Sequence, residues 1–159
     1  MWQRSGWILF LLIPAPNLAQ TAPIAHHKVE TFRVKASNLP TQRFADDLRS
    51  KNLEDVLKLY TQRAVFVDPS GTRYRGPAAL RDLYTRVFAT FDSDIVMSTQ
   101  SIMQGKRSNV CIEEGTFTEN LRTRATGTSM HSVGSYRFTY ELQSNGQWLL
   151  SRQEWKIPK

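Results

Sequence analysis

The chain has 159 residues, a formal net charge of +7 and a single cysteine, Cys111. This length allows one compact domain with a sizeable core and leaves little room for a second, and a lone cysteine excludes an internal disulfide. The positive residues are scattered, with no run longer than two and no interleaved aromatic residues of the kind that stack bases. We therefore expect an ordinary solvated basic surface and no nucleic-acid partner.

Residues 1–19 have the pattern of a secretory signal peptide. One positive residue, Arg4, precedes an unbroken apolar run from Trp7 to Ile13, which is too short to span a bilayer. The small residue Ala19 suits a cleavage point, so we expect removal of residues 1–19 and a secreted or periplasmic protein. A retained membrane anchor is the alternative, because only the length of the apolar run argues against it.

Residues 20–38 are polar and show no convincing hydrophobic period. We interpret them as a tether or a marginal edge strand. The adjacent His26 and His27 lack further ligands at metal-binding distances. The rest of the chain has no glycine-rich phosphate loop and no His, Cys, Asp and Glu cluster at ligand spacing, so we expect neither a metal nor another cofactor.

Two short helices are expected between Leu39 and Thr61. Pro40 and Thr41 suit a helix start, and the apolar residues that follow return at four-residue spacing. Asn52 can cap the second helix, whose first turn carries two acidic residues.

The residue types then change to β-branched and aromatic ones, and AVFV at 64–67 predicts a short buried strand. The Asp-Pro pair at 68–69 ends this strand, a turn follows, and residues 72–75 can return as a brief second strand. Pro77 suits the first position of a third helix, where its missing N–H is harmless. Apolar residues recur at three and four positions as far as Phe91 and give that helix one broad apolar face.

Four strands are expected in the remainder, at 94–104, 109–119, about 128–142 and 148–157. The Asn145 and Gly146 pair is a strong hairpin signal. Helices followed by consecutive strands predict an α+β fold, with the three N-terminal helices packed on a curved, mostly antiparallel sheet. In the third of these strands, alternate residues from Met130 to Leu142 face inward, and this parity turns His131 outward and weakens it as a candidate base.

Several short motifs occur in an order that carries a resemblance: AVFVDPSG, then RYRGPAALRDLY, then the closing GSYRFTYELQSNGQWLLSRQEW. Over about residues 40–157 the chain resembles the NTF2-like superfamily, and most closely its SnoaL-like and DUF4440-type members. The resemblance implies one domain at 39–159, a small cone whose helices and sheet enclose a pocket. It also implies a homodimer formed through the sheet. It says less about chemistry, because one fold hosts many functions.

Asp68, in the sequence VDP, matches the general base of the steroid isomerases in this superfamily. The two partner positions do not match: the isomerase tyrosine falls at Phe44, and the oxyanion aspartate falls at or near Gly134. Because an enolate needs oxyanion donors for its stabilisation, we expect no steroid isomerase activity.

Two functions stay open. In the first, which we favour, the cone binds a small hydrophobic molecule or is filled by side chains, and Asp68 serves only the turn by accepting backbone N–H bonds. In the second, Asp68 is the general base of an isomerase, cyclase or hydrolase acting on a small carbonyl or polycyclic substrate. For both, the expected pocket residues are Phe44, Tyr60, Asp68, Tyr84, Phe88 and Tyr136.

Overall fold

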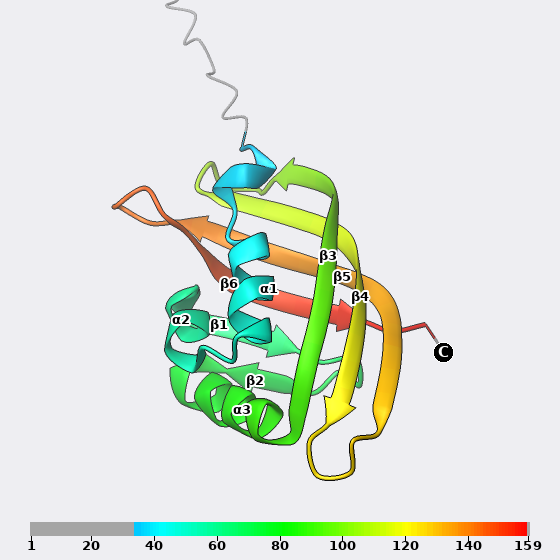
Figure 1. Ribbon diagram of the computed structural model, residues 1–159. Helices are drawn as coiled ribbons and strands as arrows, with labels where there is room; N and C mark the ends of the chain where they lie inside the picture. The colour runs from blue at the N-terminus through cyan, green and yellow to red at the C-terminus, as the bar shows by residue number, and fades with distance from the viewer. Residues whose placement is uncertain (1–33, 159) are drawn as a thin grey trace, which may run out of the picture. The chain divides into compact units, whose positions relative to one another are not determined.

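The computed structural model describes residues 34–158 (Figure 1). The expected signal peptide at 1–19 and most of the expected tether at 20–38 lie outside the described residues. The described end of the tether contains one short 3-10 helix, η1 (Ala36–Asn38). Among residues 34–158, no helix is long and apolar enough to cross a membrane.

Six strands form one sheet within the described residues. They are β1 (Tyr60–Val67), β2 (Arg73–Arg75), β3 (Phe91–Gln104), β4 (Val110–Thr123), β5 (Ser129–Leu142) and β6 (Trp148–Lys156). Their order in the sheet is β2-β1-β6-β5-β4-β3. All neighbours are antiparallel except β1 and β6, which run parallel. β1 starts at Tyr60, earlier than the strand expected at 64–67. Tyr60 already pairs with Leu150 of β6, and a register shift between Tyr60 and Val65 separates this pair from the rest of the strand.

Three helices cover this sheet: α1 (Thr41–Arg49), α2 (Leu53–Lys58) and α3 (Gly76–Thr90). Asn52 caps α2, since its side-chain oxygen accepts a hydrogen bond from the backbone N–H of Asp55 at 3.3 Å. Pro77 lies in the first turn of α3, as the sequence predicts. Among the α-helices of residues 34–158, α1 and α2 precede the sheet and α3 does not. The expectation of three N-terminal helices is therefore corrected, because α3 is inserted between β2 and β3.

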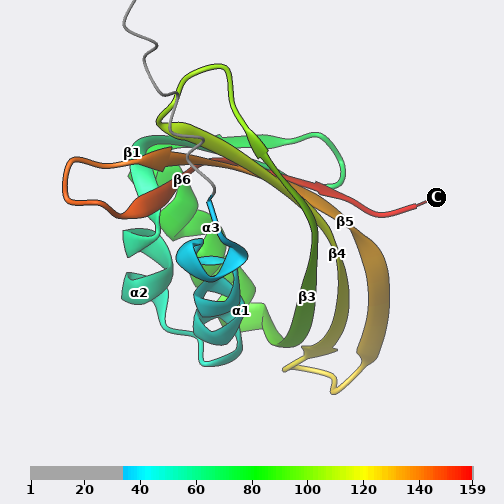
Figure 2. The same cartoon turned by 90° about the horizontal axis from the view of Figure 1, so that it is seen from above.

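The sheet curls around α1 and α3, as the view from above shows (Figure 2). Register shifts accompany this curvature, one in β3 between Thr99 and Ser101 and one at Thr139 and Tyr140 in the pairing of β5 with β6. A β-bulge adds a residue to one strand of a pair and bends it. The expected α+β fold with a curved, mostly antiparallel sheet is thereby confirmed.

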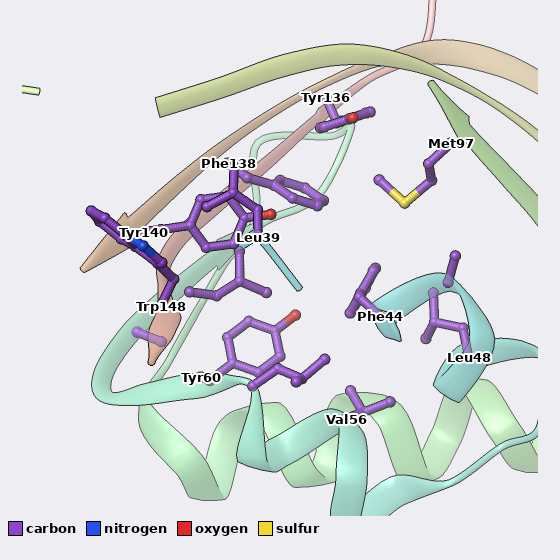
Figure 3. Packing of buried hydrophobic residues seen from close by; sticks show 14 of the residues in the cluster. Leu39, Phe44, Leu48, Val56, Tyr60, Met97, Tyr136, Phe138, Tyr140 and Trp148 are labelled. Atoms are coloured by element: carbon purple, nitrogen blue, oxygen red, sulfur yellow. The ribbon is translucent and has the colours of Figure 1, made fainter. Parts of the chain in front are cut away.

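The core fills the concave side of the sheet. Aromatic side chains from α1, β1 and β5 meet there, among them Phe44, Tyr60 and Phe138 (Figure 3). The Phe44 ring meets the Phe138 ring edge to face, with centroids 5.9 Å apart. Such edge-to-face pairs add to the stabilisation that burial alone provides.

Strand β5 alternates as expected along most of its length. Gly134, Tyr136 and neighbouring alternate residues as far as Tyr140 are buried, whereas His131 is exposed and its Nδ1 lies 2.7 Å from the Asn120 side-chain oxygen. Met130 departs from the expected parity, since its side chain is 45% exposed near the start of the strand. The outward position predicted for His131 is confirmed.

Candidate functional site

A cavity lies between α1, α3 and the sheet, with a volume of about 160 Å³. All but two of its lining residues are apolar or aromatic, the exceptions being Ser93 and Glu119. The exposed residues Pro69 and Ile157 place its mouth beside the turn after β1 and the end of β6. The apolar and aromatic residues are Phe44, Leu48, Phe66, Pro69, Leu83, Tyr84, Val87, Phe88, Ile95, Phe117, Trp155 and Ile157.

The volume limits what the cavity can hold. A cavity of about 150 Å³ with apolar walls takes up one benzene molecule, whereas sites for drug-sized ligands span roughly 300–1,000 Å³. A single ring or a short branched chain therefore fits. The polycyclic substrate considered from the sequence is too large for the cavity as it stands.

Of the six residues expected to line the pocket, Phe44, Tyr84 and Phe88 do so. Tyr60 lies behind the wall, where its hydroxyl is 2.5 Å from that of Tyr84 and also donates to the side-chain oxygen of Gln153. Burial raises the pKa of both tyrosines well above the usual range, so the two hydroxyls stay protonated. This network fixes the Tyr84 ring against the cavity.

Tyr136 also lies away from the cavity. Its hydroxyl donates a hydrogen bond to Oε1 of Glu113 at 2.9 Å, and burial raises its pKa. The hydroxyl is therefore held as a structural donor to Glu113, outside the lining of this cavity.

Asp68 holds the turn between β1 and β2. Its Oδ1 accepts hydrogen bonds from the backbone N–H groups of Ser70 and Thr72, both at 2.9 Å, and from the Ser70 hydroxyl at 2.5 Å. Partial burial acts to raise the pKa of Asp68, but these hydrogen bonds outweigh it and the pKa is lowered. Pro69 beside it lines the cavity, whereas Asp68 does not. These contacts support the turn role, because a carboxylate with a lowered pKa is a weak base.

The two positions that differ from the steroid isomerases have well-defined surroundings. Phe44 is buried among rings, including that of Trp155 with its centroid 6.3 Å away. A Cβ atom at Gly134 would overlap the carbonyl oxygen of Lys156 and the ring of Phe117. An aspartate therefore cannot occupy position 134 without moving β6.

The polar corner of the cavity is a pair that the sequence analysis missed, Glu119 on β4 and Ser93 on β3. The Ser93 hydroxyl donates to Oε1 of Glu119 at 2.6 Å. No hydrogen bond from residues 34–158 reaches the second oxygen, Oε2. Burial raises the pKa of the Glu119 carboxyl, and the bond from Ser93 only partly opposes this. The alternation rule could have found Glu119, since it shares the inward parity of Phe117.

A second carboxylate on the same face of β4, Glu113, is 1% exposed and lies away from the cavity. Its Oε1 accepts from Thr99 at 2.5 Å and from Tyr136 at 2.9 Å. Its Oε2 accepts from Tyr140 at 3.0 Å and from Thr41 at the start of α1. Four hydroxyl donors thus satisfy one buried carboxylate and join α1 to three strands.

The remaining candidates for chemistry are inert or scattered. Cys111 is buried, and burial raises the pKa of its thiol to about 11, so it stays protonated. In the part of the chain that the structure describes, no three His, Cys, Asp or Glu side chains lie close enough together to hold a metal ion.

Solved structures with this architecture define the class of protein. A ketosteroid isomerase-like protein from Erwinia carotovora atroseptica matches with a TM-score of 0.71 and 15% identity, over 80% of this chain and 99% of that one. An NTF2-like superfamily protein from Salmonella enterica matches with a TM-score of 0.67 and 16% identity, over 77% and 89%. A hexachlorocyclohexane dehydrochlorinase, LinA type 2, matches with a TM-score of 0.66 and 13% identity, over 77% and 82%. At these identities the likeness shows the fold alone, which is NTF2-like.

The family follows from the sequence itself. The model of the SnoaL-like domain matches residues 41–150, and the chain therefore belongs to the SnoaL-like family. No curated protein matches it. The fold has both ligand-binding and catalytic members, so the function has to be argued from the geometry of the site.

Proposed function

We propose that this protein binds a small hydrophobic molecule, about the size of one ring, in the cavity between α1, α3 and the sheet, and that it does so without catalysis. The observation that carries the proposal is the cavity itself, with about 160 Å³ of space and walls that are apolar except at Ser93 and Glu119. Transfer of an apolar molecule from water into such a space is favourable.

The walls support binding because they are already in place. The Phe117 and Trp155 rings pack edge to face with centroids 4.8 Å apart, and the Tyr84 hydroxyl is held by Tyr60. A site that is built before the ligand arrives loses little conformational entropy on binding.

The alternative, an acid or base enzyme with Asp68 as its general base, has weaker support. Asp68 would have to leave the hydrogen bonds from Ser70 and Thr72 before it could reach a substrate. A general base has to lie within hydrogen-bond reach of the proton that it removes. The cavity therefore favours binding over catalysis through Asp68.

Two further expectations accompany this proposal. A signal peptide at residues 1–19 would direct export and then be cleaved, and the N-terminal sequence of the mature protein tests this. A homodimer through the outer face of the sheet would cover Val96 on β3 and Val133 on β5, which are 59% and 51% exposed. Both residues are paired with Thr118 of β4, so they lie in one row across the three strands. A strictly monomeric mass at micromolar concentration would contradict the dimer.

The binding proposal is tested by titrating the protein with toluene and following the NMR signals of Leu83 and Phe88. We expect saturable shifts at these residues. Val87→Trp places a large ring in the cavity lining and should abolish them, whereas the matched control Val96→Trp, on the outer face, should leave them intact. If wild-type protein shows no saturable shift with toluene, or if both variants bind equally well, the proposal is wrong.

A further inference from the structure

We propose that Glu119 makes the cavity a site for a small hydrophobic cation: the carboxylate would pair with an ammonium group while the surrounding rings enclose the apolar body of the ligand. This inference rests on the proposed function, and it names the chemical class of the ligand. Two features of residues 34–158 support it: a carboxylate with a free oxygen and no basic residue beside it in the cavity lining, and a wall of aromatic rings around that charge.

The first feature is an uncompensated negative charge. Glu119 accepts one hydrogen bond, from Ser93 at 2.6 Å, and Oε2 has no partner among residues 34–158. No lysine, arginine or histidine lines the cavity in the described part of the chain. A partly buried carboxylate without a counter-charge is costly, and a ligand ammonium would supply the missing charge and hydrogen-bond donor.

The second feature is the kind of surface around that charge. Phe117 precedes Glu119 by two residues on the inward face of β4, and Trp155 packs against Phe117. Tyr84 and Phe88 form another pair of rings across the cavity, with centroids 5.8 Å apart. Aromatic faces attract cations by electrostatics, and the attraction grows when water is excluded. In an alkyl or benzyl ammonium ion, the ammonium group would therefore pair with Glu119 and the apolar part would contact the aromatic rings.

Other charged groups do not compete for this role. Tyr84 on α3 is the one other titratable residue in the lining, and its hydroxyl is held by Tyr60. Burial and the Ser93 hydroxyl are the two influences on the pKa of Glu119. The nearby charged or titratable side chains on the surrounding elements line no part of the cavity: Asp47 on α1, Arg86 on α3, Asp92 and Asp94 on β3, Arg122 on β4, His131 on β5 and Lys156 on β6.

The test compares four ring-sized probes on the full-length protein: benzylamine, benzyl alcohol, benzoate and toluene. At pH 7.5 we expect benzylamine to bind at least about tenfold more tightly than its neutral isostere benzyl alcohol, and benzoate not to bind. The preference should shrink as the pH falls through the pKa of Glu119, because protonation removes the carboxylate charge. Glu119→Gln should abolish the preference, so that benzylamine binds no more tightly than benzyl alcohol. The control Glu114→Gln, on the outward face of the same strand, should keep the preference.

The outcomes separate this inference from the proposed function. If toluene binds while benzylamine and benzyl alcohol bind equally well, the cation site is wrong and the apolar cavity stands. If no probe binds, both proposals are wrong. Tighter binding of benzyl alcohol would assign ligand recognition to a donor such as the indole N–H of Trp155, which has no hydrogen-bond partner within residues 34–158, and would overturn the role of Glu119. The pH dependence of the wild-type protein decides the question even if Glu119→Gln does not fold.

Discussion

Glu113 and Glu119 lie on the same inward face of β4, and yet their surroundings are opposite in character. Glu113 accepts hydrogen bonds from four hydroxyl groups and is 1% exposed. Glu119 accepts one hydrogen bond from Ser93 and borders a cavity. Residue type and strand parity are the same in both cases, so the number of donors around each carboxylate makes the difference. A carboxylate with all its partners holds the fold together, whereas one with a free oxygen beside open space is available to a ligand.

The largest effect that would test this comparison is the loss of Glu113. Glu113→Ala leaves four hydroxyl groups without their acceptor, three of them on buried residues, and opens a small cavity, so we expect the free energy of unfolding to fall by about 3 kcal/mol. Urea denaturation measures this change. Glu114→Ala, next along the strand and partly exposed, should cost less than about 1 kcal/mol. Equal losses in the two variants would show that the hydroxyl cluster contributes little.

The second-largest effect is expected for a substitution at Gly134, which is paired on β5 with Phe117 of β4. The Phe117 ring separates Glu113 from Glu119 along β4 and packs against Gly134. A Cβ atom there overlaps this ring and the Lys156 carbonyl oxygen, so Gly134→Ala should destabilise the protein by roughly 2 kcal/mol. It should also weaken toluene binding by displacing Phe117. Ser135→Ala, which points outward, is the control and should change neither thermal stability nor binding.

A third carboxylate, that of Asp68, belongs neither to the hydroxyl cluster around Glu113 nor to the cavity beside Glu119. Asp68→Ala removes the acceptor of two backbone N–H groups, and we expect a loss of about 1 kcal/mol with toluene binding unchanged. The pKa of Asp68 is lower in the folded state. Its stabilisation is therefore present above the ordinary aspartate pKa of about 3.9, and it is lost as the pH falls through the folded value. Denaturation of wild type and variant from pH 2 to 7 (~one-unit steps) would show this convergence. Loss of ligand binding in Asp68→Ala would argue for a direct role in the site.

The smallest effect, and one of opposite sign, is expected for Glu119 without ligand. Because its pKa is raised by folding, the unfolded chain ionises first, and stability is lost as the pH rises from the ordinary glutamate pKa of about 4.3 through the folded value. Glu119→Gln should therefore stabilise the free protein by roughly 0.5 kcal/mol at pH 7, and this gain should vanish below about pH 4. A destabilised Glu119→Gln at pH 7 would mean that the carboxylate has a stabilising partner.

Local signals in the sequence predicted most of the fold. The Asn145 and Gly146 pair forms the expected hairpin turn between β5 and β6, with Gly146 at a φ of 81° that a side chain would resist. The inward parity of β5 was predicted because alternation is a property of neighbouring residues. The parallel pairing of β1 with β6 was not, since it joins segments far apart in the chain and no local pattern records it.

The site was predicted less well, for a related reason. Phe44, Tyr84 and Phe88 line the cavity as expected, whereas Tyr60 and Tyr136 have hydroxyl groups that bond to Gln153 and Glu113 behind its walls. Which buried aromatic residue borders open space depends on packing between distant elements. Glu119 is within reach of the alternation rule, because it shares the inward parity of Phe117 on β4, but that rule does not tell which inward residue borders open space.

The position of β6 has a consequence for how the molecule forms. This strand lies between β1 and β5 and contributes Trp155 to the cavity and Gln153 to the support of Tyr84. Its pairing with β1 closes a loop that contains α3 and three long strands, and contacts of such long sequence separation form slowly. Trp155 also packs against Phe44 of α1, with ring centroids 6.3 Å apart, so β6 covers part of the aromatic face of that helix. The cavity is therefore complete only when β6 is paired with both neighbours, because the strand supplies part of the wall and part of its support.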